Sequence, residues 1–237
     1  MKLTFKLAAV AFAVTSLFSR PIFGDMIISQ YYEGTSNNKW IELTNVGSST
    51  IDLGAGNYRL SGFNNANRSL WLSGNDASIN GGTFVLTGNV AAGGTIVLRN
   101  GSANTPAYAV AGSINAGTSG VNFNGDDSVV LWAGTSYSFS NIIDTFGITG
   151  NTGQDTSFVR NANILTGTNA NFNASQWTQF SLADVNSAAV GTTQRLGFHS
   201  FSAVPEPATM LLLGVAGIGG FAFRRFRRKS VSETIAS

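Results

Sequence analysis

Short stretches of alternating apolar and polar residues fill the middle of the chain. In the stretch NNKWIELTNVG, Ile41 and Leu43 fall on one side of an extended backbone. Trp40, Glu42 and Thr44 fall on the other side. Side chains of a β-strand alternate between two faces, so this pattern predicts a half-buried strand.

The same reading predicts a series of strands rich in β-branched and aromatic residues and separated by turn residues. The further segments are 26–34, 58–63, 69–73, 83–87, 95–99, 107–111, 128–133, 142–147, 156–160 and 175–181. Many short strands at such spacing favour a sandwich or barrel. A sustained apolar repeat of helical period is absent between residues 25 and 203, so negligible helix is expected there.

Residues 1–24 have the pattern of a signal peptide. Lys2 and Lys6 form a positive start, and the 12 residues Leu7–Phe18 carry no charge. An apolar run of this length is too short to span a bilayer and is typical of a secretory signal. We therefore expect export, with cleavage after Ser19 or Gly24.

A second apolar run lies near the C-terminus. The 16 residues Ala208–Phe223 are uncharged and would form a helix of about 24 Å, which is short for a hydrocarbon core of about 30 Å. A basic cluster follows, and the positive-inside rule places it in the cytoplasm together with a tail, residues 230–237. The cluster consists of Arg224, Arg225, Arg227, Arg228 and Lys229.

Residues 204–229 resemble a PEP-CTERM sorting signal. The elements of that pattern occur in order: Pro205-Glu206-Pro207, a short glycine-bearing apolar segment, and an arginine-rich end. The resemblance implies an exosortase-type processing enzyme as partner and transient anchoring in the inner membrane. It further implies a final place on the cell surface or in the extracellular matrix of a Gram-negative bacterium, with exopolysaccharide or other surface proteins as candidate partners.

Residues 25–203 resemble a lamin-tail domain. The resemblance rests on IISQYYEGTSNNKWIELTNVGSSTIDLGAGNYRL, followed in order by FNGDDSVVLW, IIDTFG, SQWTQF and TQRLGFHSF. It implies an all-β fold, an immunoglobulin-like antiparallel sandwich. In bacteria such domains often accompany extracellular nuclease domains, whereas here only targeting sequence is expected outside the module.

Charge and cysteine content restrict the function of residues 25–203. This span holds six basic and ten acidic residues, a net charge of −4, and the chain's overall +2 comes from its termini. Nucleic-acid binding requires clustered positive charge, so we expect no nucleic-acid partner. The chain has no cysteine, which excludes disulfides and thiolate chemistry.

Few residues suggest catalysis or metal binding. His199 is the sole histidine, and it is interpreted as a polar or half-buried residue that closes the sandwich. Asp126 and Asp127 are weak calcium candidates, with an ordinary turn as the favoured alternative. Glu33 and Glu42 would flank a site if their strands paired, although solvent-facing positions are expected.

The tryptophans also allow two interpretations, a core role or a carbohydrate-stacking platform, and the core role is favoured. They are Trp40, Trp71, Trp132 and Trp177. No cofactor is expected. The favoured function is that of a non-enzymatic surface or matrix protein whose sandwich mediates adhesion or interaction. The alternative is an extracellular hydrolase of polysaccharide or nucleic acid that uses surface carboxylates and calcium.

Overall fold

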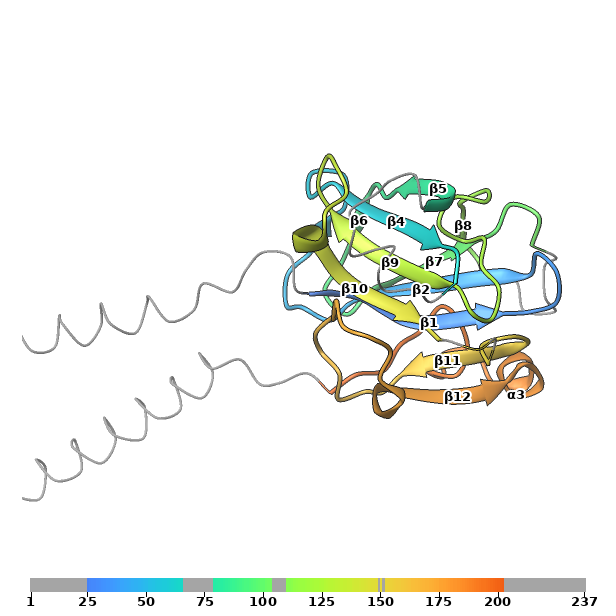
Figure 1. The fold of residues 1–237 in the computed structure, drawn as a ribbon. Coiled ribbons are helices and arrows are strands. Elements are labelled where there is room, and N and C mark those ends of the chain that lie inside the picture. Colours follow the sequence, from blue (N-terminus) through green and yellow to red (C-terminus); the bar gives the residue numbers. More distant parts are fainter. Residues whose placement is uncertain (1–24, 66–78, 104–109, 149, 151, 203–237) are drawn as a thin grey trace, which may run out of the picture. The chain divides into compact units, whose positions relative to one another are not determined.

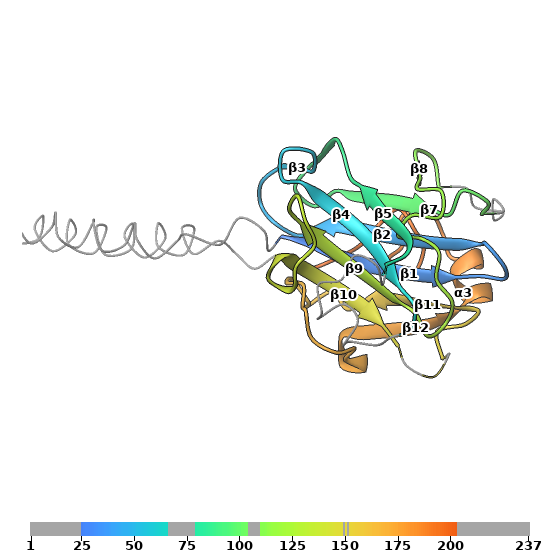
Figure 2. The ribbon, with the colours of Figure 1, turned by 45° about the horizontal axis from the view of Figure 1, so that its top comes forward.

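The computed structural model describes residues 25–65, 79–103, 110–148, 150 and 152–202. Within these ranges the chain folds into two facing β-sheets, which confirms the predicted all-β sandwich (Figures 1 and 2). The predicted signal peptide, the sorting motif, the 208–223 segment and the basic cluster lie outside the described residues.

The larger sheet has six strands in the order β12-β11-β1-β2-β7-β8. All neighbours are antiparallel except β7 and β8, which are parallel. Its strands are β1 (Met26–Glu33), β2 (Lys39–Asn45), β7 (Thr95–Arg99), β8 (Ile114–Asn115), β11 (Thr156–Arg160) and β12 (Trp177–Ser181).

The smaller sheet has four antiparallel strands in the order β10-β9-β4-β5. They are β4 (Tyr58–Phe63), β5 (Ile79–Val85), β9 (Ser128–Ala133) and β10 (Ile142–Gly147). A separate ribbon pairs β3 (Ile51–Asp52) with β6 (Asn89–Val90). Five strands have the predicted bounds, whereas segment 69–73 and most of 107–111 lie outside the described residues.

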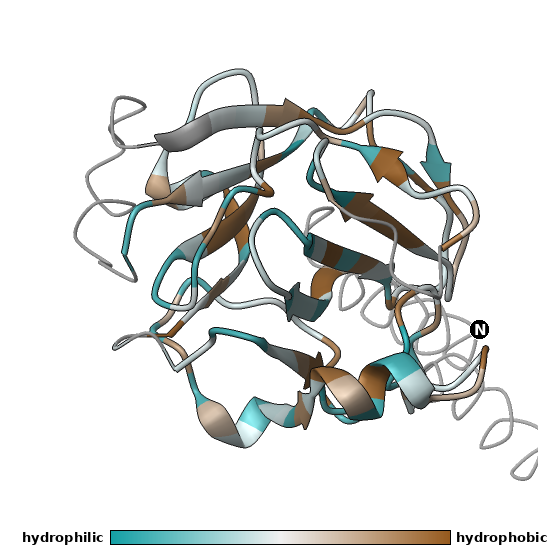
Figure 3. Cartoon of the chain, turned by 90° about the vertical axis from the view of Figure 1, so that its right-hand side faces the viewer, coloured by the Kyte–Doolittle hydropathy of each residue, from teal (hydrophilic) through white to brown (hydrophobic). Residues whose placement is uncertain are grey.

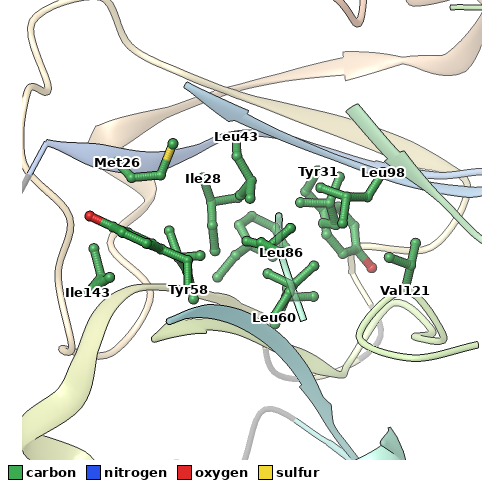
Figure 4. Close-up of a cluster of buried hydrophobic side chains, with 14 of the residues drawn as sticks. Met26, Ile28, Tyr31, Leu43, Tyr58, Leu60, Leu86, Leu98, Val121 and Ile143 are labelled. Carbon is green, nitrogen blue, oxygen red and sulfur yellow. The ribbon is translucent and has the colours of Figure 1, made fainter. Parts of the chain in front are cut away.

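The main core lies between the two sheets (Figure 4). Side chains from β1 and β2 meet those from β4, β9 and β10, and the Tyr31 ring stacks on Phe146 at 4.2 Å between centroids. Members from both sheets are fully buried, including Met26, Ile28, Leu43, Leu60, Leu98 and Val121. In a chain without disulfides, this buried apolar surface is the main source of stability.

The prediction of a half-buried second strand is wrong, because β2 is buried on both faces. Trp40 joins Tyr32 and Val97 in a second apolar cluster on the other side of the large sheet. Val185 and Leu196, from the C-terminal part of the domain, complete this cluster. The large sheet is therefore a central layer, with an apolar cluster on each of its faces. In Figure 3, hydrophobic residues occur both on the strands and on a short helix.

Helix is sparse among the described residues, although one short helix was not foreseen. It is α3 (Leu182–Ser187), whose N-cap Ser181 accepts a hydrogen bond from the Asp184 amide. Two 3-10 turns, η2 (Phe139–Asn141) and η3 (Ala174–Gln176), precede strands. None of the helices in the described ranges is long and apolar enough to cross a membrane.

Candidate functional site

Asp126 and Asp127 lie in the turn that leads into β9. Asp127 is buried, and its carboxylate accepts hydrogen bonds from the backbone amides of Asn65 at 2.7 Å and Asn124 at 2.9 Å. The side-chain NH2 of Asn124 faces an oxygen of each carboxylate. These donors already stabilise the two aspartates as a turn, the favoured alternative, and calcium binding there stays a prediction.

Glu33 and Glu42 do not form a carboxylate pair. Their strands are adjacent, but Glu33 lies opposite Lys39, whereas Glu42 lies opposite Gln30 on the other face of the sheet. Both are buried, so the expectation of solvent-facing carboxylates is wrong. The Glu33 carboxylate accepts hydrogen bonds from Lys39 Nζ at 2.6 Å and from the Tyr31 hydroxyl at 2.7 Å. Burial raises the pKa of Glu33, and the Lys39 bond opposes that rise.

Glu42 fastens the C-terminal end of the domain to the central layer. Its carboxylate accepts hydrogen bonds from the Ser29 hydroxyl at 2.7 Å and from the Gly197 amide at 2.6 Å. Burial raises the pKa of Glu42, these bonds and one from the Phe198 amide oppose part of the rise, and the net pKa is about 7. The groups that bond this carboxylate are neutral, which suits an anchor and not a paired acid and base.

His199 is buried, deeper than its expected half-buried place, and neither ring nitrogen has a hydrogen-bond partner among the described residues. Burial, followed by the nearby Arg160 charge, lowers the pKa of His199 to about 4. A catalytic histidine needs a hydrogen bond to its nucleophile and to an orienting carboxylate. His199 makes neither bond and acts as part of the closing core.

Three of the four tryptophans are buried, which confirms the core interpretation for them. Trp40, Trp132 and Trp177 are at most 8% exposed, and Trp71 lies outside the described residues. A sugar-stacking platform needs an open ring face, which these three do not offer. In the described ranges, three or more His, Cys, Asp or Glu side chains nowhere gather into a group that could hold a metal ion.

The sequence reading missed a buried ion pair between Asp144 and Arg160. Both side chains are fully buried, and Arg160 stacks on Trp177 with its guanidinium carbon 4.1 Å from the ring centroid. Asp144 also accepts bonds from the backbone amides of Ile28 at 2.8 Å and Thr168 at 2.9 Å. Burial raises the pKa of Asp144, and Arg160 opposes that rise.

This ion pair supports a polar cleft on the connection between β11 and β12. Arg160 extends one hydrogen bond outward, from Nη1 to Gln176 Oε1 at 2.9 Å. The cleft has a volume of about 330 Å³, and none of the described residues that line it is charged. The lining residues are Thr168, Ala170, Asn171, Asn173 and Gln176.

The β11–β12 connection is held against β10, beside which it runs in Figure 1. The Thr145 hydroxyl donates to the carbonyl oxygens of Thr168 at 3.1 Å and Ala170 at 3.2 Å. Gly167 approaches the Ile143 carbonyl so closely that a Cβ would clash with it. The sequence signal for this site was a single charged residue in each of two otherwise uncharged strands, Asp144 in IIDTFG and Arg160 in TSFVR.

Comparison with known families identifies the domain. The Lamin Tail Domain family matches residues 21–165, more than half of the 237 residues. The chain belongs to this family. The family match agrees with the predicted immunoglobulin-like fold of the sandwich. Beyond residue 165, however, the lamin tail domain of this chain continues through β12, α3 and the segment that reaches Glu42. A search of curated proteins finds no match.

A second family, the PEP-CTERM protein-sorting motif, matches residues 203–228. This confirms the predicted combination of a sorting signal with a lamin tail domain. The motif implies processing by exosortase, a membrane enzyme, and hence export with transient anchoring in the membrane. The roles of Pro205, Glu206, Pro207 and the basic cluster within it stay predictions.

Proposed function

We propose that this protein is a surface or extracellular-matrix protein of a Gram-negative bacterium, and that its lamin tail domain is a non-catalytic interaction module. The observation that carries the proposal is the sorting motif at residues 203–228, which follows the domain along the chain. The domain boundaries would be 1–24 for the signal peptide, 25–203 for the sandwich, 204–229 for the sorting signal and 230–237 for a cytoplasmic tail.

Two features of the domain support a non-catalytic role. The buried carboxylates of Glu33, Glu42 and Asp144 are each occupied by hydrogen bonds that hold the fold. Within the described part of the chain, neither ring nitrogen of His199 has a hydrogen-bond partner for proton transfer. The hydrolase alternative requires accessible carboxylates in a shared cleft, and the cleft on the β11–β12 connection is lined by amides and hydroxyls instead.

The intact mass of the protein from its native cells tests the sorting proposal. We expect a mature extracellular form that ends near Pro205-Glu206-Pro207 and lacks the 208–223 segment. A 16-residue apolar run is a marginal span, so it holds the chain briefly while the extended proline-flanked motif meets the enzyme. Replacement of the three residues by alanine should leave an unprocessed, membrane-retained form.

The matched control replaces Pro106, the proline outside both targeting segments, by alanine and should leave processing unchanged. A mature protein that still carries Arg224–Lys229 would contradict the proposal and indicate a permanent tail anchor.

A further inference from the structure

The cleft on the β11–β12 connection presents hydrogen-bond donors whose orientation is fixed from behind. Gln176 uses its Oε1 to accept from Arg160, so its NH2 group is left without a partner among the described residues. Asn173 uses its Oδ1 to accept from the amide and hydroxyl of Ser175, at 3.1 and 2.8 Å. Its NH2 group is likewise left for a ligand.

The remaining lining adds both donors and acceptors. The Thr168 hydroxyl oxygen accepts from the Ala170 amide at 3.0 Å, which leaves its proton to donate. The side chain of Asn171 is exposed and has no hydrogen bond within the described part of the chain. A cleft of about 330 Å³ falls at the lower end of the roughly 300–1,000 Å³ range of small-ligand sites.

The described residues of the cleft offer no positive charge that would attract an anion. Arg160, the cation behind Gln176, is fully buried and neutralised by Asp144, so it presents no positive charge to a ligand. Among the described lining residues, Ala170 contributes the sole apolar side chain, which gives the side chains of a peptide little to bind. Amides and hydroxyls match a neutral ligand that carries many hydroxyl groups.

From this geometry we infer that the cleft is a binding site for neutral carbohydrate, with Asn171, Asn173 and Gln176 as its hydrogen-bonding residues. The inference rests on the proposed interaction role, for which it names the ligand class. The Asp144–Arg160 pair positions Gln176 and does not touch the sugar. Because Asn173 and Gln176 are already held in place, binding does not carry the entropy cost of ordering these two donors.

Calorimetric titration of the full chain in detergent micelles, with cellohexaose, maltohexaose and chitohexaose as probes, tests the inference. At least one neutral hexasaccharide should bind. Asn171→Ala should weaken that binding about fivefold, the value of one hydrogen bond of about 1 kcal/mol. Gln176→Glu should weaken it similarly, because the carboxylate keeps the Arg160 bond and loses the NH2 donor.

Asn37→Ala, an exposed amide in the β1–β2 turn, is the matched control and should bind as the unmodified chain does. Hexagalacturonate and an alanine-glycine decapeptide serve as anionic and peptide counterparts. Preferred binding of either one would overturn the ligand class. Absence of binding, or binding that both cleft variants retain, would overturn the site. The titration does not depend on tail processing, so its failure is distinct from failure of the sorting proposal.

Discussion

Glu42 shows how a polar residue can stabilise a layer that hydrophobic patterning alone does not reveal. It lies on the face of β2 that also carries Trp40, and it bonds the Gly197 amide more than 150 residues away in the sequence. The bonding groups are neutral, so burial of the charged form is costly and raises the pKa of Glu42 to about 7.

The Glu42→Gln variant should remove this cost. The folded pKa lies above the unfolded value of about 4.5, so the wild-type contribution of Glu42 is most favourable below pH 4.5 and is lost as pH rises toward 7. The difference in unfolding free energy between variant and wild type should therefore shift by about 3 kcal/mol in favour of the variant between pH 4.5 and pH 8. Urea unfolding at a series of pH values measures it.

The difference between the two proteins is the useful quantity because His199 acts in the opposite sense. Its folded pKa of about 4 lies below the usual value, so its contribution to stability is lost as pH falls from about 6.5 toward 4. Asp155→Asn, an exposed carboxylate at a positive-φ position that asparagine tolerates, is the control. Equal pH dependence of Glu42→Gln and wild type would contradict the assigned pKa.

Burial could be predicted from the sequence for the large aromatic residues, but not for polar residues on the outer face of the large sheet. The three described tryptophans were expected in the core because large aromatic side chains dominate a core without disulfides. Glu42 was assigned to solvent because alternation in a two-layer sandwich leaves one face exposed. The layer that covers it comes from residues 182–199, for which the apolar pattern predicts neither a strand nor a helix.

At the scale of elements, the Asp144–Arg160 pair joins β1, β10, β11 and the β11–β12 connection. Arg160 lies on β11, donates from Nε to the Ile28 carbonyl on β1 at 3.2 Å, and reaches Gln176 near β12. Asp144 lies on β10 in the opposite sheet. The pair therefore ties the two sheets together at one end of the sandwich.

Asp144→Asn should destabilise the domain by about 3–5 kcal/mol, because Arg160 is left buried without its counter-charge. The asparagine NH2 group would also face the Ile28 or Thr168 amide, both of which donate to Asp144. Adding Arg160→Met to Asp144→Asn should restore part of the loss. Urea unfolding of the single and double variants measures the coupling, and strictly additive losses would show that the pair does not act as a unit.

The elements themselves were largely predictable, and their pairing was not. Strands such as β4, β7 and β9 follow from local patterns of β-branched and aromatic residues. The order β12-β11-β1-β2 pairs the start of the domain with its end, and a single sequence holds no signal for that contact. The cleft was missed for the same reason, since its polar loop resembles any Asn-rich and Thr-rich linker.

At the scale of the whole molecule, the domain closes well beyond the residue at which the family match ends. The match stops at residue 165, yet Trp177 belongs to the main core and Val185 to the second cluster. Gln30 donates to the Gln194 carbonyl at 3.0 Å, and the Ser200 amide donates to the Thr193 hydroxyl at 3.2 Å. The closing segment thus supplies an edge strand, core side chains and polar partners.

A chain of residues 25–202 should therefore fold cooperatively, and one of residues 25–165 should not. The shorter chain loses β12, the Trp177 ring that covers Arg160, and the Gly197 amide that bonds Glu42, so it exposes buried apolar surface and loses hydrogen bonds that hold the layers together. Near-ultraviolet circular dichroism and urea unfolding should show fixed aromatic packing and one sharp transition for 25–202 alone. If both chains unfolded in the same single sharp transition, the sandwich would be complete without its closing segment.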